Sequence, residues 1–500
     1  MTTDTASTPV PVRDRLAPRD SRVVWLLLGA AFVAILNETT MGVAIPHLID
    51  DLGITALMAQ WLTTAFMLTM AIVIPITGFL LQMFPTRRVF LFAMSLFSAG
   101  TLLALVSPGF PMLVVARVVQ ASGTAIMMPL LMTTLMTVVP THIRGRMMGR
   151  VSVVISLAPA IGPTLAGFIL DTLSWRWIFG VVLPIALIML AIGARWMENI
   201  GETEHAPIDI PSVVLSALGF GGVVFGLSQI GSAGRGEGTT DAAADTATWT
   251  LAAAFAIGAI ALAAFVWRQL RLQRIDDALL DLRVFGAAGF TLSVAQMLLL
   301  SVAFFGAITV LPLYLQHVLH LKAMESGLTV LPGAIAMGVL GPVIGRVYDR
   351  WGTRVLLAPG SVLSSAVLWY YTTIDESTSV WVVTVAQTVL SIGLALSFTP
   401  LFTASLGSLP RRFYSHGSAV VGTVQQVAGA AGIALMFTVM SATSAGVVEH
   451  GGTAVAGEAA GTRVAFLIAA VVALPTIIGA FLIRKPDDDA EDSDHPPSGR

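Results

Sequence analysis

The sequence predicts an all-α integral membrane protein with fourteen transmembrane helices. Hydrophobic residues make up 56% of the 500 residues and charged residues only 11%, about half the charged fraction of ordinary soluble domains. The mean hydropathy is +0.84, and long apolar segments recur along the whole chain. A soluble core has no use for so much apolar surface, so we expect the chain to lie in a bilayer.

Fourteen segments are long enough to cross a membrane, which takes about 20 mainly apolar residues. We expect the first to be a mature helix, because it is too long for a signal-peptide core and lacks a small-residue cleavage site. Two intervening segments, 231–248 and 441–462, are rich in Gly, Ala, Thr and Ser and are predicted to be flexible. The predicted helices are 23–46, 57–81, 88–108, 111–134, 147–170, 176–197, 209–230, 249–267, 288–312, 327–348, 354–373, 379–402, 418–440 and 463–483.

The basic residues give the predicted orientation, since cytoplasmic loops carry an excess of Lys and Arg. With a cytoplasmic N-terminus, 22 of the 27 basic residues fall in inward segments. The outward segments keep only Arg176, Arg235, Lys322 and Arg463, and Arg117 lies within the membrane. We therefore predict a multi-pass protein of the inner or plasma membrane with both termini in the cytoplasm.

Several classes of protein are excluded by what the sequence lacks. The chain contains no cysteine, which removes disulfides, thiolate metal sites and thiol chemistry. It has no GxxxxGK[ST] phosphate loop, and no segment between helices is long enough for a nucleotide-binding domain. No nucleophile and base constellation is visible, and neither His47 nor His317 has metal-ligand spacing. We predict neither an enzyme nor an ATP-driven pump, with no cofactor, no metal and no nucleic-acid partner.

An internal repeat indicates two bundles. The loop after the second helix reads GFLLQMFPTRR at 78–88, and the loop after the tenth reads GRVYDRWGTR at 345–354. The repeats start 267 residues apart, more than six helices occupy, so two helices are predicted to lie between two six-helix bundles. The predicted organisation is a cytoplasmic segment 1–22, an N-terminal bundle 23–197, two linker helices 198–287, a C-terminal bundle 288–483 and a disordered acidic cytoplasmic tail 484–500.

Only two ionisable residues, Glu38 and Arg117, are predicted to lie deep within the apolar segments. Such a residue costs about 2.5 to 3.5 kcal/mol even on the lenient insertion scale, so a functional role is the default interpretation. Both lie about 9 to 12 Å from the outer helix ends at 1.5 Å per residue, so they are able to interact. Burial and a neighbouring guanidinium act in opposite senses on a carboxyl group. Small rearrangements would therefore let Glu38 take up a proton on one side and release it on the other; the alternative is a static ion pair that fixes helix packing.

Five motifs in order carry a resemblance to a known family: LNETTMGVAIP at 36–46, QWLTT at 60–64, RVVQASG at 117–123, APAIGPTLAG at 158–167 and WRWIF at 175–179. Over residues 20–485 the chain resembles the major facilitator superfamily, and within it the 14-helix drug:proton antiporters of the lincomycin-resistance and multidrug-efflux type. The resemblance implies the major facilitator fold, antibiotic resistance by export and a monomer. One departure is that the family's usual aspartate position holds Asn37. The carboxylate has moved to Glu38, about 100° around the helix, which leaves open whether it faces the same cavity.

The resemblance also implies gating elements. Gly and Pro in the fifth helix allow close helix contact and a kink and favour export, although both residues are common in any membrane helix. The loop arginines and an aspartate would hold one conformation by contacts on the inward side; the alternative is that these arginines serve only as topology signals. The first loop has Gln82 at the acidic position and Pro85 at the glycine position. The candidate gating residues are Gly78, Arg87, Arg88, Gly162, Pro163, Gly167, Gly345, Asp349, Arg350 and Arg354.

The candidate cavity residues are neutral and polarisable, which suits amphipathic or aromatic compounds better than sugars or phosphates. Together with Glu38, Arg117, the fifth-helix motif and the fourteen spans, they lead us to predict proton-coupled multidrug efflux of hydrophobic or amphipathic drug-like compounds by alternating access, with Glu38 and Arg117 as the coupling residues. The alternatives are a dedicated exporter of one metabolite, antibiotic or lipid, and a non-transporting membrane receptor with this fold. The candidate cavity residues are Asn37, Trp61, Thr64, Gln120, Met127, Gln296, Gln425 and Gln426.

Overall fold

A computed structural model describes residues 17–200, 209–233, 241–275 and 277–485, and every regular element among them is helical. The predicted all-α class is confirmed. Most of the predicted terminal segments, at 1–16 and 486–500, lies outside the described residues. The long helices are α1 Pro18–Leu52, α2 Ala56–Met83, α3 Thr86–Leu105, α4 Phe110–Val138, α5 Arg144–Thr172, α6 Arg176–Trp196, α7 Ile210–Ala233, α8 Asp241–Leu272, α9 Ala288–Leu313, α10 Ala323–Trp351, α11 Arg354–Tyr371, α12 Val380–Gly407, α13 Tyr414–Glu449 and α14 Ala454–Leu482.

Within the described ranges, thirteen helical spans are long and apolar enough to cross a membrane by length and composition. The exception is α11, an 18-residue helix that packs along α12 and α14 and completes the bundle. The short turns are η1 Thr141–Ile143, η2 Gln273–Ile275, η3 Leu282–Gly286, a π turn η4 Tyr314–Val318 that continues α9, and η5 Arg411–Phe413.

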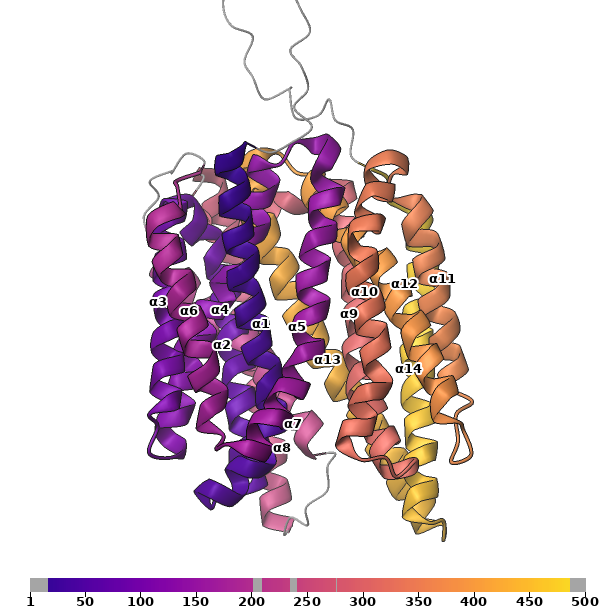
Figure 1. Ribbon diagram of the computed structural model, residues 1–500. Helices are drawn as coiled ribbons and strands as arrows, with labels where there is room; N and C mark the ends of the chain where they lie inside the picture. The colour runs from indigo at the N-terminus through magenta and orange to yellow at the C-terminus, as the bar shows by residue number, and fades with distance from the viewer. Residues whose placement is uncertain (1–16, 201–208, 234–240, 276, 486–500) are drawn as a thin grey trace, which may run out of the picture.

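The helices form two groups that stand side by side (Figure 1). In one, α3 packs on α4 and α6, and α1 packs on α4, α5 and α6. In the other, α9 packs on α12, α13 and α14, and α11 packs on α12 and α14. Helices α7 and α8 form a pair, of which α7 also packs on α2 and α13. We call these groups the N bundle (α1–α6) and the C bundle (α9–α14).

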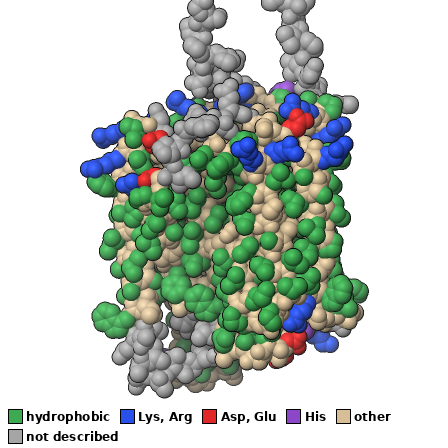
Figure 2. All heavy atoms as spheres, turned by 90° about the vertical axis from the view of Figure 1, so that its left-hand side faces the viewer, with side chains coloured by type: hydrophobic (Ala, Val, Ile, Leu, Met, Phe, Trp, Pro, Cys, Tyr) green, Lys and Arg blue, Asp and Glu red, His purple; other side chains and the backbone are tan. Residues whose placement is uncertain are grey.

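Basic side chains gather at the end of the molecule where α1 begins, above a broad band of hydrophobic side chains (Figure 2). We call this the terminal end and the other the opposite end. At the terminal end Arg19 pairs with Glu198, and Lys485 donates to the carbonyl oxygen of Asp349 at 3.2 Å. The charged rims and the apolar band fit a molecule that crosses a membrane.

Several helices extend beyond their predicted ends, and the segment 231–248, predicted to be flexible, is helical at its described residues because α7 runs to Ala233 and α8 begins at Asp241. Helix α1 continues to Leu52, six residues past its predicted end. The prediction that 441–462 is flexible is wrong for most of that segment, because α13 runs to Glu449 and α14 begins at Ala454. Alanine has the highest helix propensity of all residues, and it is frequent in this segment. The side chain of Thr453 also caps the start of α14, because its Oγ1 accepts a hydrogen bond from Ala456 N at 3.1 Å.

The N bundle depends on close backbone approach between α3 and α4. A Cβ on Gly123 of α4 would overlap the carbonyl oxygen of Ala93 and lie 2.7 Å from Phe97 N on α3. Glycine is therefore required there by packing rather than by backbone conformation.

Gly123→Ala is expected to lower the thermal unfolding midpoint in detergent, because overpacking costs about 1 to 3 kcal/mol. Gly42→Ala on α1 is the matched control: a Cβ there would meet nothing within 4 Å. It should leave stability unchanged or raise it by about 0.5 to 1 kcal/mol, since alanine favours a helix over glycine. Equal midpoints for the two variants would contradict this packing.

Candidate functional site

Arg117 on α4 lies at the centre of a buried polar cluster and is 1% exposed. Its Nη1 donates to Gln120 Oε1 at 2.7 Å and to Asn37 Oδ1 at 3.3 Å. Its Nε donates to the carbonyl oxygen of Leu62 at 3.5 Å, and the guanidinium lies 4.1 Å from the ring centroid of Phe66. The contacts therefore join α1, α2 and α4 around one positive charge.

Gln120 extends the cluster to α3. Its Nε2 donates to Thr101 Oγ1 at 2.8 Å, and Thr101 donates to the carbonyl oxygen of Phe97 at 2.7 Å. Gln120 is fully buried, so here it holds Arg117 rather than lining an open cavity. Phe66 and Thr101 were not recognisable from the sequence, since an aromatic residue and a threonine in a membrane helix are ordinary packing residues.

Glu38, one residue after Asn37, is half-buried and within electrostatic reach of Arg117. Among the described residues, no hydrogen bond or ion pair links its carboxylate to a partner. Consecutive residues point about 100° apart on a helix. The neutral amide of Asn37 therefore lies beside Arg117, while the side chain of Glu38 points in a different direction. The static ion pair considered from the sequence is absent in this conformation, and the acid is free to find another partner.

The glycines of the fifth helix have different surroundings. A Cβ on Gly162 would overlap Thr39 Oγ1 and lie 3.5 Å from the carbonyl oxygen of Leu36, so α5 abuts the turn of α1 that carries Glu38. A Cβ on Gly167 would meet nothing within 4 Å. The side chain of Pro163 lies outside the described side chains.

The second loop motif joins the two bundles at the terminal end. The carboxylate of Asp349 on α10 accepts from Gly145 N at 2.7 Å and Arg146 N at 2.9 Å, at the first turn of α5. These N–H groups have no partner within their own helix, and the helix dipole favours an anion there. A Cβ on Gly345 would overlap the carbonyl oxygen of Gly145.

Other candidate gating residues have separate contacts. The first loop motif reaches the C bundle through Gln82, which donates to the carbonyl oxygen of Arg412 at 3.0 Å, and through Gly78, where a Cβ would lie 3.1 Å from Ala419 Cβ. Arg87 donates to Ala194 O at 2.6 Å within the N bundle. Arg88 and Arg354 are exposed, and the guanidinium of Arg350 lies 5.5 Å from the ring of Trp351.

Two hydroxyl pairs, which sequence reasoning missed, also connect the bundles. Thr133 of α4 and Ser418 of α13 lie 2.7 Å apart, and Ser152 of α5 and Thr399 of α12 lie 2.5 Å apart. A lone Ser or Thr gives no signal in a sequence, because the same side chain often bonds only its own helix.

The remaining candidate cavity residues are not gathered at one site. Gln296 donates to Thr476 O at 3.1 Å within the C bundle, Met127 is buried in the main core, and the ring of Trp61 lies 5.8 Å from that of Phe225 on α7. Thr64 is buried on α2, while Gln425 and Gln426 are half-buried on α13.

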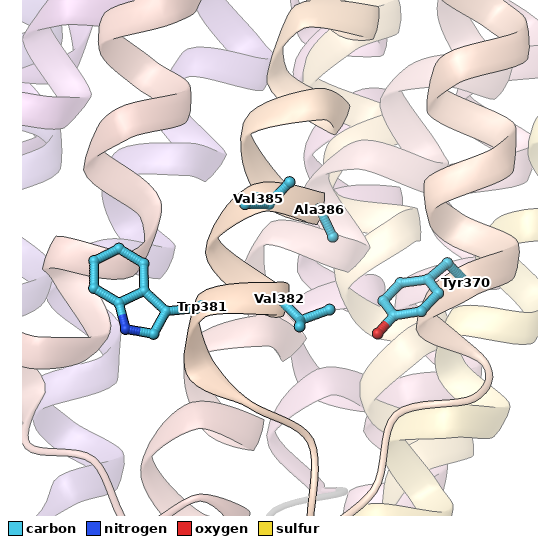
Figure 3. A pocket seen from close by; sticks show the side chains of 5 residues that line it. All are labelled: Tyr370, Trp381, Val382, Val385 and Ala386. Carbon is cyan, nitrogen blue, oxygen red and sulfur yellow. The ribbon is translucent and has the colours of Figure 1, made fainter.

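A separate apolar hollow of about 420 Å³ lies between α11 and α12. Figure 3 shows Tyr370 on one side and Val382 facing it, with Trp381 turned away. The other lining residues are Val385 and Ala386. None of these residues belongs to the Arg117 cluster, so the hollow is peripheral to the candidate site.

Two helical bundles that are joined at one end, with a buried charge inside one of them, are the architecture of a membrane transporter rather than an enzyme. The chain belongs to the Major Facilitator Superfamily, whose sequence profile matches residues 27–433. It is a multi-pass membrane protein with the major facilitator fold, as predicted.

Relatives and solved structures agree with this assignment. The chain is 41% identical over 474 residues to the uncharacterized MFS-type transporter YcnB of Bacillus subtilis, covering 94% of this chain and 96% of the relative. It is 39% identical to the lincomycin resistance protein LmrB of Listeria monocytogenes, covering 93% of this chain and 96% of the relative. It is 29% identical to a multidrug resistance protein B homolog of Mycobacterium tuberculosis, covering 86% of this chain and 77% of the relative. The human organic anion transporter MFSD10 has a similar fold, with a TM-score of 0.64, 13% identity and coverage of 93% and 100%. The proton:xylose symporter XylE also has a similar fold, with a TM-score of 0.59 and 14% identity; the match covers 92% of this chain and 96% of XylE.

Gln120→Leu is expected to destabilise the protein by about 1 to 3 kcal/mol, because it leaves buried hydrogen-bonding groups of Arg117 and Thr101 unpaired. The same substitution at half-buried Gln426 is the matched control and should change stability by less than about 0.5 kcal/mol. Thermal unfolding in detergent measures both. Equal shifts would mean that Gln120 does not hold Arg117.

Proposed function

We propose that this transporter exports hydrophobic or amphipathic compounds in exchange for protons, by alternating access, as a monomer in the plasma membrane. It would need no cofactor, since the proton gradient supplies the energy. The observation that carries the proposal is Glu38, a half-buried carboxyl group without a hydrogen-bond partner among the described residues, next to a fixed arginine.

The energetics of Glu38 suit a proton carrier. An unpaired carboxylate within the membrane is costly, so it either takes a proton or finds a cation. Arg117 is held by neutral partners, with Asn37 and Gln120 accepting its hydrogen bonds, so its charge stays uncompensated by a contact ion pair. A modest shift of α1 relative to α4 changes the distance between the two charges, and with it the proton affinity of Glu38.

Alternating access is supported by the faces of α5 and α10. At the terminal end the pairs Gly145 and Gly345, and Gly149 and Gly341, meet backbone to backbone. Eighteen residues are five helical turns, so Gly167 lies on the same face of α5 as Gly149. Gly327 lies on the same face of α10 as Gly345.

At the opposite end this face is open, because a Cβ on Gly167 or Gly327 would meet nothing within 4 Å. The two helices are antiparallel, and continuing the register of the Gly145–Gly345 and Gly149–Gly341 pairs puts Gly167 within about one helical turn of Gly327, an offset of about 6 Å along the axis. The same glycine-lined faces are therefore equipped to meet at the opposite end once they separate at the terminal end.

The basic rim supports an orientation with the terminal end in the cytoplasm (Figure 2). The conformation described here would then be open outward. Entry of one proton down a 100 mV potential supplies about 2.3 kcal/mol, which sustains a roughly fiftyfold gradient of a neutral compound.

The substrate class rests on the relatives, whose names refer to lincomycin and multidrug resistance. Glu38 and Arg117 are the two charges that the proposal places in the central part of the membrane. An uncharged amphipathic compound loses little there by leaving water.

Glu38→Gln is expected to abolish efflux of a fluorescent amphipathic dye from cells, because glutamine cannot carry the proton. A protonophore should abolish wild-type efflux in the same way. Glu449→Gln, at an exposed position at the end of α13, is the matched control and should export normally at equal expression.

Export and proton exchange by the Glu38→Gln variant would contradict the proposed coupling role of Glu38. A folded wild type that moves no dye would replace multidrug export with a dedicated metabolite, antibiotic or lipid exporter. Ligand binding without any flux would indicate a receptor instead.

Alternating access predicts that a short bifunctional thiol reagent joins Gly167→Cys to Gly327→Cys during turnover, and that this cross-link stops transport. The chain has no native cysteine, so the background is clean. Gly167→Cys with Gly446→Cys is the control pair, since Gly446 on α13 also has open space but does not lie on the α5 and α10 faces. Equal cross-linking of both pairs, or none in the first, would contradict the register.

A further inference from the structure

We propose that membrane-dissolved substrate passes between the bilayer and the space between the bundles only at the α5/α10 seam, because α7 closes the α2/α13 seam. This route rests on the drug-efflux function proposed above. The two most extensive seams between the bundles lie between α5 and α10 and between α2 and α13. The inserted helices make these two seams unequal.

Helix α7 contacts both sides of the α2/α13 seam. Ala71 of α2, Val224 of α7 and Ala430 of α13 form one apolar cluster. Toward the opposite end, the ring of Trp61 on α2 lies 5.8 Å from that of Phe225 on α7. The contacts on α2 cover about three helical turns, so α7 fills the seam over a considerable depth.

Polar contacts hold the α7–α8 pair together at the terminal end. Arg268 of α8 donates two hydrogen bonds of 2.7 Å to the carboxylate of Asp209, which precedes α7. These bonds hold the pKa of Asp209 below its ordinary value, so the pair stays ionised. Gln269 donates to Ser212 Oγ at 2.7 Å. The two helices are therefore expected to move as one unit.

The same unit is attached to the C bundle. Gln269 Oε1 accepts from Leu280 N at 3.1 Å, and Asp281 N donates to Nδ1 of buried His416 on α13 at 3.4 Å. On α2, by contrast, α7 meets apolar groups: a Cβ on Gly221 would lie 3.3 Å from Ile72 Cδ1. Apolar surfaces slide more readily than hydrogen-bonded ones, so α7 stays with α13 and keeps covering α2 as the bundles rock.

The α5/α10 seam has a different character. At the terminal end it is closed by glycine contacts, whereas Gly167 and Gly327 at the opposite end have open space. Side chains that flank this opening are apolar and exposed, including Leu328 (57%) and Ile335 (47%) on α10 and Phe168 (67%) on α5. Leu328 and Ile335 lie about 80 to 100° around the helix from Gly327, on the side away from Gly333, which contacts α12.

The opening therefore presents apolar side chains to the bilayer, and between one and two turns along α5 from Gly167, Gly162 abuts the turn of α1 that carries the carboxyl group of Glu38. An amphipathic compound in the leaflet matches both surfaces, since its apolar body contacts the flank while its polar group moves inward. A fully polar solute gains nothing from such a flank and would use the aqueous side.

The test is photolabelling in proteoliposomes with an amphipathic dye that carries a diazirine and partitions into the bilayer. Peptide mass spectrometry should find adducts on the opposite halves of α5 and α10 that excess unlabelled dye removes. Residues of α2 and α13 beside α7 should carry none. Removable adducts on α2 or α13 beside α7, with dye efflux intact, would overturn the route but not the function. Absence of both efflux and removable adducts would overturn the efflux function, and the route with it.

A matched pair of variants adds a functional readout. Leu328→Cys at the opening and Leu102→Cys on α3 are both exposed leucine positions near the opposite end, 57% and 47% exposed. After alkylation with the same bulky maleimide, Leu328→Cys should lose the adducts and export dye severalfold more slowly, whereas Leu102→Cys should behave as wild type. Slower export with undiminished adducts on α5 and α10 would mean that the label blocks rocking rather than access, and would overturn the route.

Discussion

The backbone contact between α5 and α10 at the terminal end holds the two bundles in their present relation. Where glycines face each other, the helices meet without side chains between them, so the contact depends on exact shape and tolerates no added Cβ at Gly149 or Gly345. Asp349 adds a charge-assisted cap on the first turn of α5. Both interactions break together when the helices part. Closure is therefore close to all-or-none, as the proposed alternating access requires.

The polar cluster within the N bundle separates two tasks. Arg117 is immobilised by Asn37, Gln120 and the ring of Phe66, and a guanidinium keeps its charge under all ordinary conditions. Glu38 has no such restraint. An aspartate in place of Asn37 would pair with Arg117 directly, whereas in the proposed mechanism Arg117 provides a constant field and Glu38 takes up the proton. The separation arises from a shift of one residue along α1.

Much of the fold was predictable, because backbone groups in lipid must be paired within helices and long apolar segments then have one regular solution. The candidate site was predictable only in part. Glu38 and Arg117 stand out as charges among apolar residues, but Gln120 and Gln296 look alike in the sequence, and only packing shows that one holds Arg117 while the other bonds within the C bundle. Likewise, the composition of 441–462 favours flexibility by its glycines and helix by its alanines, and the tertiary contacts of α13 with α14 decide for helix.

The inserted pair α7–α8 changes what a two-bundle transporter is able to do. Two similar bundles that rock against each other have two equivalent seams, and each opens toward lipid in turn. A hydrophobic helix pair placed over one seam removes that equivalence at little cost, since the outward face of the pair needs only to be apolar. On that face, Ile257 and Ile260 of α8 are 52% and 71% exposed. The inward face of α7 must fit both bundles. Small residues therefore occur where α7 meets α2 and α13: Gly221 on α7, Ala71 on α2 and Ala430 on α13. The polar groups of the pair lie at the terminal end, where they attach it to the C bundle, whereas its contact with α2 is apolar.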